Sequence, residues 1–97
     1  MTNNKIIKFN ALVEPSEVGK GGAFVRVPVD IHAVFGKGRV FVRAAFDGEE
    51  YQGSVVNMGV KNSDGTICYI LGVRKDILKK IGKTVGNEIK VVLEVLV

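Results

Sequence analysis

The chain has 97 residues, which fits one domain, and its 46% hydrophobic and 25% charged content is typical of a globular protein and argues against disorder. Fourteen basic against ten acidic residues give a net charge of +4, which permits attraction to an anion but falls short of a dense basic arm. The single cysteine excludes an internal disulfide, and no signal peptide or membrane-spanning run is present, so we expect a cytoplasmic protein.

The chain begins with alternating apolar and polar residues, followed by a glycine-rich loop. Residues 5–14 predict a strand with one apolar face, formed by Ile7, Phe9, Ala11 and Val13. The run from Gly19 to Gly22 resembles a phosphate-binding loop. However, it lacks the hydroxyl residue of such a loop and leads into a strand, so we interpret it as a connection. Residues 23–27 predict the second strand.

A strand–helix–glycine–strand unit occurs twice, over residues 24–44 and 70–95. Aligning the copies matches Val27 with Val73, Asp30 with Asp76, Ile31 with Ile77, Phe35 with Ile81 and Gly36 with Gly82. Coinciding caps and apolar stripes of this kind predict a pseudo-twofold fold. Identity between the copies is low, so two unrelated units of similar pattern are the alternative interpretation.

Each copy carries the start and stop signals of a short helix. We expect Pro28 and Arg74 to open the helices and the aligned aspartates to lie in the first turns, near the positive helix end. The aligned glycines predict left-handed residues at the helix ends. The apolar stripes are Ile31, Val34 and Phe35 in the first copy and Ile77, Leu78 and Ile81 in the second, and of these we expect Ile31, Phe35, Ile77 and Ile81 to be buried.

Four more strands complete the prediction, over residues 39–46, 50–57, 66–73 and 88–96. The Asp47-Gly48 pair between the first two of them is a strong signal for a hairpin. Six strands and two short helices predict a mostly-β, closed or nearly closed barrel whose ends the helices cover. The whole chain, residues 1–97, is expected to form this one domain.

The sequence offers no constellation for catalysis or metal binding. His32 is the only histidine, Cys68 the only cysteine, and the acidic residues are scattered without a spacing that implies acid–base work. We therefore expect no enzyme, no catalytic residue, no metal site and no cofactor.

The candidate contacts for an anion or a nucleic acid are Arg26, Lys37, Arg39 and Arg43. The arginines fall on outward positions of strands that we expect to be neighbours, and arginines on a rigid sheet can hold phosphates. Only Phe41 matches an aromatic position of an RNA-recognition strand, so base stacking is not expected. The alternative is a solvated face neutralised by nearby glutamates.

Two stretches resemble one bacterial family. They are Val-Pro-x-Asp-Ile followed by a short helix, Phe-Gly and Arg-Val-Phe-Val-Arg-Ala, and Val-Arg-Lys-Asp-Ile followed by Asn-Glu-Ile-Lys-Val-Val-Leu-Glu. The family is a domain of unknown function often found N-terminal to OmpD-associated, bacteriocin-protection-type domains. Its Gly-Asp turn is Gly86-Asn87 here. The resemblance implies a six-stranded double-split β-barrel with a pseudo-twofold repeat, capped by two short α-helices, as in AbrB/MazE-like DNA-binding proteins.

These observations predict binding rather than catalysis. We expect a small binding or accessory domain for a protein or a small anionic molecule. The alternative is weak, backbone-directed binding of nucleic acid, which the fold analogy alone supports only weakly. If one chain closes the barrel, the protein should be a monomer or a dimer joined through a sheet edge.

Overall fold

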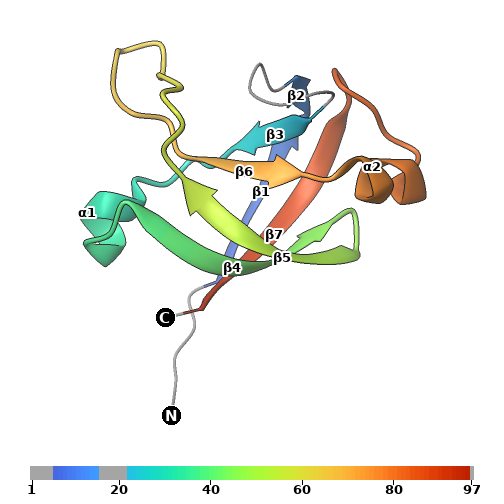
Figure 1. Ribbon diagram of the computed structural model, residues 1–97, viewed down its shortest axis with the longest axis horizontal. Coiled ribbons are helices and arrows are strands. Elements are labelled where there is room, and N and C mark those ends of the chain that lie inside the picture. The colour runs from blue at the N-terminus through green and yellow to red at the C-terminus, as the bar shows by residue number, and fades with distance from the viewer. Residues whose placement is uncertain (1–5, 16–21, 97) are drawn as a thin grey trace.

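The structure is a computed structural model of the chain, and it describes residues 6–15 and 22–96. The described residues form one curled sheet with a short helix on either side of it (Figure 1). In chain order the elements are β1 (Ile6–Leu12), β2 (Glu14–Pro15), β3 (Ala23–Arg26), α1 (Ile31–Phe35), β4 (Arg39–Phe46), β5 (Glu49–Val56), β6 (Ile70–Val73), α2 (Lys75–Ile81) and β7 (Glu88–Leu96). None of the helices described here is long and apolar enough to cross a membrane.

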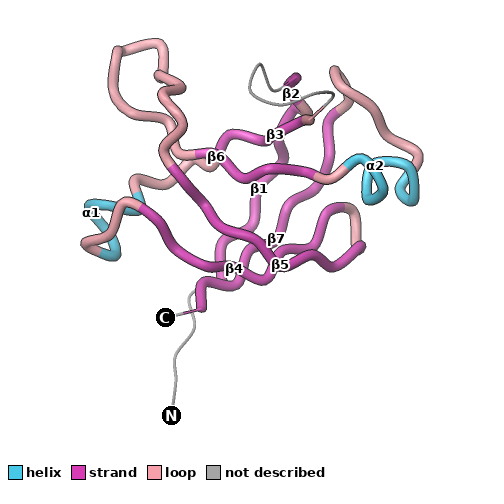
Figure 2. Tube along the Cα trace, viewed as in Figure 1, coloured by secondary structure: helices cyan, strands magenta, loops and turns pink. Residues whose placement is uncertain are grey.

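The sheet has seven antiparallel strands in the order β1-β7-β4-β5-β6-β3-β2. The strands at the two ends of this order, β1 and β2, are consecutive in sequence and are separated only by Val13. The sheet therefore curls back on itself into a strongly curved half-barrel, which the trace in Figure 2 follows, and β1 also contacts β3.

The prediction of six strands is wrong because the predicted strand over residues 5–14 bends at Val13 and becomes two. There the chain leaves β7: the N–H of Val13 donates to the carbonyl of Asn87 at 2.9 Å, and the N–H of Gly86 donates to the carbonyl of Val13 at 2.8 Å. Beyond the bend, β2 pairs only with β3. Pro15 has no N–H to donate, which suits an edge strand.

The core lies on the inner side of the curled sheet, on the face that the apolar alternation predicts. Every second residue of β4 and β7 is buried; these are Val40, Val42, Ala44 and Phe46, and Ile89, Val91, Leu93 and Val95. The two strands are in register, so that Val42 lies opposite Val95 and Phe46 opposite Val91. Each fully buried side chain of this kind contributes about 1.5–3 kcal/mol to folding.

The hairpin predicted at Asp47-Gly48 is confirmed. Asp47 and Gly48 both have positive φ, at 48° and 89°, which is the backbone of a type I′ turn. The Asp47 carboxylate also accepts a hydrogen bond from the N–H of Lys90 at 2.7 Å. This contact ties the turn between β4 and β5 to β7, the other neighbour of β4.

Helix α1 begins later than the sequence predicts. Asp30 is the N-cap of the helix and not a residue of its first turn: its Oδ1 accepts from the N–H groups of His32 and Ala33, both at 3.1 Å. Pro28 therefore lies ahead of the helix, because the aspartate side chain supplies the helix start in its place.

The apolar stripe of α1 is only partly buried. Ile31 is 1% exposed, as predicted, and Phe35 packs against the core while remaining partly exposed. Val34, which also belongs to the stripe, is 49% exposed. A helix of only five residues makes little more than one turn, too short to bury three consecutive stripe positions.

Helix α2 follows the prediction more closely. Ile77 and Leu78 are buried, and Ile81 packs partly buried against the core. Asp76 lies in the first turn as expected, while Arg74 occupies the N-cap without making a capping hydrogen bond. Both helices end as predicted, at Gly36 and Gly82, each with φ of 69°, a conformation that costs a residue with a side chain about 1–2 kcal/mol.

Candidate ligand-binding cleft

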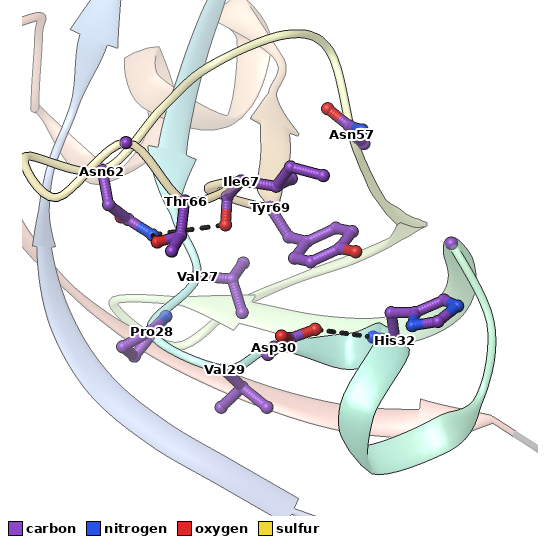
Figure 3. A pocket seen from close by; sticks show the side chains of 12 residues that line it. Val27, Pro28, Val29, Asp30, His32, Asn57, Asn62, Thr66, Ile67 and Tyr69 are labelled. Carbon is purple, nitrogen blue, oxygen red and sulfur yellow. Dashed lines mark hydrogen bonds between the residues drawn. The ribbon is translucent and has the colours of Figure 1, made fainter.

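An open cleft of about 840 Å³ separates α1 from the long connection between β5 and β6 (Figure 3). This volume lies within the usual range of small-molecule sites. One wall is the segment from β3 into α1, and the other is the connection over residues 57–69. We call this space the α1 cleft. It combines apolar side chains such as Val27, Val29 and Ile67 with polar ones, among them Asp30 and Tyr69.

The first wall is set by the end of β3 and by the helix cap. The N–H of Val27 donates to the carbonyl of Tyr69 at 2.9 Å, which holds this wall against the far one at the base of the cleft. Asp30 then caps α1 through Oδ1 alone. Its second carboxylate oxygen makes no hydrogen bond within the described residues, so it remains available to a ligand. The exposed His32 side chain follows on the helix.

The second wall is a hydrogen-bonded turn. The N–H of Asn62 donates to the carbonyl of Thr66 at 2.8 Å, and the Asn62 amide donates to the Thr66 hydroxyl at 3.1 Å and to the Ile67 carbonyl at 3.2 Å. Asp64 accepts from the hydroxyl and the N–H of Thr66, at 2.6 and 3.0 Å. These bonds hold the pKa of Asp64 below its usual range. These hydrogen bonds shape the turn from Asn62 to Thr66 that forms this wall.

Arg26 anchors this second wall to the sheet. Its Nη1 donates to the carbonyl of Lys61 at 3.0 Å, while its Nε donates to Glu14 Oε2 at 2.7 Å. The hydrogen bond to Glu14 raises the pKa of Arg26 further above its ordinary value. The guanidinium fork thus links β2, β3 and the 57–69 connection, a geometry that a lysine ammonium cannot reproduce.

Tyr69 supplies the most informative polar group of the cleft. The residue is only 6% exposed, and its hydroxyl makes no hydrogen bond to any described residue. No fully buried side-chain oxygen or nitrogen in the described residues lacks a partner, so the hydroxyl must reach solvent. It does so in the cleft, where Figure 3 shows the ring pointing into the space between the walls. A buried ring that offers only its polar tip is typical of a binding position.

The electrostatics of the α1 cleft are set by a carboxylate. Its described lining contains no lysine or arginine, and the ionisable side chains there are Asp30, His32 and the Tyr69 phenol. Carboxylate oxygens only accept hydrogen bonds, whereas the tyrosine hydroxyl both donates and accepts. The described lining therefore suits a ligand that donates hydrogen bonds. Among the described residues no cluster of three or more metal-binding side chains occurs.

The four basic residues predicted as anion contacts do not share one strand pair. The expectation that their strands are neighbours is wrong, because β5 and β6 lie between β3, which carries Arg26, and β4. Arg26 already donates hydrogen bonds to Glu14 and to the carbonyl of Lys61. Arg43 donates to Glu94 Oε1 at 3.1 Å across the β4–β7 pair. Strands β5 and β6 thus separate β3 from β4, although these two strands follow one another along the chain.

Lys37 and Arg39 lie closer together, on the connection from α1 to β4 and at the start of β4. Both are exposed, and neither forms an ion pair within the described residues. The Arg39 guanidinium carbon lies 5.6 Å from the centroid of the Phe41 ring, which is 61% exposed. This contact is a cation–π pair on the outer face of the sheet.

The predicted phosphate-binding resemblance at Gly19 to Gly22 lies almost entirely outside the described residues.

Sequence reasoning missed Tyr69 and the turn that faces it. Tyr69 precedes β6 within a run of buried residues, Cys68 to Leu71, and nothing in that run marks one hydroxyl as open to a cleft. The polar segment Asn62 to Gly65 was available as a signal, since it indicates a structured turn. Its position opposite α1 depends on the strand order, which the local pattern does not specify.

The fold and cleft define a class: a small, mostly-β domain with a strongly curled antiparallel sheet and two short helices. The sequence matches the family model described as "Domain of unknown function (DUF1905)" over residues 9–93. The chain therefore belongs to this family, which agrees with the resemblance of its two repeated stretches. No curated protein matches the chain.

Proposed function

We propose that this chain is a small-molecule binding domain whose ligand occupies the α1 cleft, and that it binds the ligand without catalysing a reaction. The hydroxyl of Tyr69 carries the proposal, because a nearly buried side chain directs its only polar atom into the α1 cleft. A polar group in that position gives specificity to a ligand that satisfies it. Asp30 serves as a second anchor, with one oxygen already committed to the helix.

The ligand that suits this lining carries an amino or hydroxyl group beside an apolar body. The donor group would meet the Asp30 carboxylate and the Tyr69 hydroxyl, and the apolar body would pack on Val27, Val29 and Ile67. The anionic small molecule expected from the net charge suits this cleft less well, because the described lining holds the Asp30 carboxylate and no lysine or arginine. A neutral or cationic ligand is the more specific proposal.

The test uses three probes of equal size and different charge: benzylamine, benzyl alcohol and benzoate. Amide resonances of labelled protein should shift over residues 27–32 and 57–69, most strongly with benzylamine and least with benzoate. Tyr69→Phe removes only the hydroxyl and should weaken benzylamine binding by about five- to tenfold, the usual effect of losing one hydrogen bond. Tyr51→Phe, which lies outside the cleft, should leave it unchanged.

Two results would contradict the proposal. One is binding that is equal in the wild type and in Tyr69→Phe. The other is a set of shifts that is centred away from the two walls. A preference for benzoate would keep the cleft as a site but would contradict the ligand class that Asp30 implies.

Weak binding of nucleic acid is the second candidate function, favoured by the exposed Phe41 ring beside Arg39. Arg26 and Arg43 already hold glutamates, which leaves Lys37 and Arg39 as the better candidates of the predicted four. Two neutralised phosphates give a log–log salt slope of about −1.8 on duplex DNA, so the binding should vanish at physiological salt. A fluorescence titration of duplex and single-stranded oligonucleotides at graded salt tests this, and sequence-selective binding would contradict it.

We further propose that the two strand–helix–strand units are related by a pseudo-twofold repeat within a double-split barrel, as the family resemblance implies. Both helices end at a left-handed glycine with φ of 69°, Gly36 or Gly82, and this likeness supports the repeat. We also propose, from the sequence observations alone, that the protein is cytoplasmic and that it is a monomer or a dimer joined through a sheet edge. Light scattering over a dilution series measures the oligomeric state.

A further inference from the structure

A second, smaller pocket lies beside α2. Figure 1 shows α2 on the opposite side of the molecule from α1, which borders the α1 cleft. It measures about 320 Å³ and is lined by the buried Ala23 and Leu78, by Thr84 and Val85 after the helix, and by three lysines, Lys75, Lys79 and Lys83. We call it the α2 pocket. Lys75 and Lys79 are four residues apart on the helix, so they project from one face. Lys83 continues the same spacing just past the C-cap.

None of the three lysines forms an ion pair with a described residue, although Asp76 directly follows Lys75 in the sequence. The described lining of the pocket contains no aspartate or glutamate. Two other basic residues of this segment are paired: Lys80 Nζ lies 3.3 Å from Glu49 Oε1, and Arg74 Nε lies 3.1 Å from Asp76 Oδ1. Lys75, Lys79 and Lys83 therefore form a positive cluster beside the pocket, and like charges at this spacing destabilise a helix.

The backbone around the pocket is fixed by hydrogen bonds. The N–H of Lys83 donates to the carbonyl of Leu78 at 3.0 Å, and the N–H of Thr84 donates to Asn87 Oδ1 at 2.9 Å. The Thr84 hydroxyl makes no hydrogen bond to a described residue. Lys83 is half-buried and lines the pocket. The described lining thus combines three lysines and one threonine with the apolar side chains of Ala23, Leu78 and Val85.

We propose that the α2 pocket binds a compact small-molecule anion with at least two negative charges, in the form of phosphate or carboxylate groups. Lysine ammonium groups bind such anions as point charges, and a pocket of about 320 Å³ has room for a group such as a pyrophosphate or a tricarboxylate. This site is independent of the function proposed for the α1 cleft. The opposite charge of the two sites means that one ligand class does not suit both.

The experiment is a titration of labelled protein with pyrophosphate, citrate and acetate at low ionic strength, followed by amide resonances. Pyrophosphate or citrate should saturate and shift residues 75–85, while acetate should not. The replacements Lys75→Gln, Lys79→Gln and Lys83→Gln should each weaken the binding by about two- to fivefold, as expected for one exposed charge. Glutamine keeps the helix propensity of lysine, so these variants should fold.

Lys80→Gln is the matched control, because it removes the same charge from the same helix on the side that faces Glu49. It should change the affinity much less than the pocket variants do. A preference for pyrophosphate over citrate assigns phosphate chemistry, and the reverse assigns carboxylate chemistry. The proposal is overturned if Lys80→Gln weakens binding as much as the others, if neither anion saturates, or if an oligonucleotide binds these lysines more tightly than pyrophosphate does.

Discussion

The two helix-bearing units of this fold share a backbone plan but differ in charge. Each runs from a buried strand into a short helix that ends at a left-handed glycine, and each helix buries an isoleucine at the aligned position, Ile31 or Ile77. The α1 unit starts with a carboxylate cap and opens a cleft whose described lining holds no lysine or arginine. The α2 unit starts with an arginine and borders a pocket of three lysines.

This difference separates what the fold requires from what it leaves free. Buried apolar positions and left-handed glycines occur in both units because the backbone cannot close without them. The residue ahead of each helix and the charges around it differ, because an exposed position changes stability little whichever residue it holds. Binding chemistry is therefore expected at the positions where the two copies diverge, and the following changes measure that expectation.

The largest effect should come from the shared core positions. Ile31→Ala and Ile77→Ala each remove a buried side chain and should cost about 2–5 kcal/mol of unfolding free energy. Phe35→Ala, at a partly exposed position, should cost less than the roughly 3–5 kcal/mol of a fully buried phenylalanine. Denaturant unfolding gives these values, and Val34→Ala is the exposed control. A large difference between Ile31→Ala and Ile77→Ala would break the structural equivalence of the two units.

The second effect concerns the helix starts, where the units differ. Asp30→Ala removes both capping bonds of α1 and should cost about 0.5–2 kcal/mol, whereas Asp30→Asn should retain most of the cap. At the other helix, Arg74→Ser should introduce a cap that is absent now and should stabilise by up to about 1 kcal/mol. Thermal unfolding of the three variants measures this. An Arg74→Ser protein less stable than the wild type would show that the exposed Arg74–Asp76 pair outweighs a serine cap.

The sequence predicts the elements of this fold well, because each depends on a local signal. The alternation in β4 and β7, the turn at Asp47-Gly48 and both helix ends follow from residue patterns within one or two turns of chain. The α1 start is misplaced because Pro28 and Asp30 are both good starting residues, and the capping bonds of Asp30 decide between them. The bend at Val13 depends on Asn87, a partner distant in sequence.

The candidate sites are predicted less well, because they depend on strand order. Arg26 looks like a surface charge in the sequence, but the structure pairs it with Glu14 and with the carbonyl of Lys61, 35 residues away. Tyr69 looks like one more core residue until the 57–69 connection is placed opposite α1. The lysines of α2 are visible in the sequence, although only the structure shows which of them face Glu49 and which face a pocket.

A smaller effect should show that the α1 cleft and the α2 pocket are anchored to the sheet in different ways. The wall of the α1 cleft is anchored by a side chain, Arg26, whereas the turn beside α2 is anchored by main-chain bonds to Val13. Arg26→Ala should cost no more than about 1 kcal/mol, since the side chain is 43% exposed. It should nevertheless speed amide exchange over residues 60–68. Arg43→Ala, which also breaks one glutamate pair, should not, and equal exchange in both variants would show that Arg26 does not anchor the wall.

The smallest effect is expected at low pH. It should differ between the turn that contains Asp64 and the turn that contains Asn87, because only the first uses a charged side chain. The turn of the α1 cleft uses the Asp64 carboxylate to accept from Thr66, whereas the turn beside α2 uses the neutral amide oxygen of Asn87 to accept from Thr84. The bonds from Thr66 lower the pKa of Asp64, so they favour the folded turn above the pH at which an ordinary aspartate ionises, about 4. This contribution is lost as the pH falls through the lowered pKa of the folded state.

Amide resonances of residues 62–67 should therefore shift in acid while those of residues 84–87 stay constant. Asp64→Asn should abolish the pH dependence, and Thr66→Val, which removes the hydroxyl donor, should move the midpoint up toward that of an ordinary aspartate. Shifts of both turns with one common midpoint would mean that the whole domain responds to acid. In that case the difference in charge between the two turns would have no local consequence.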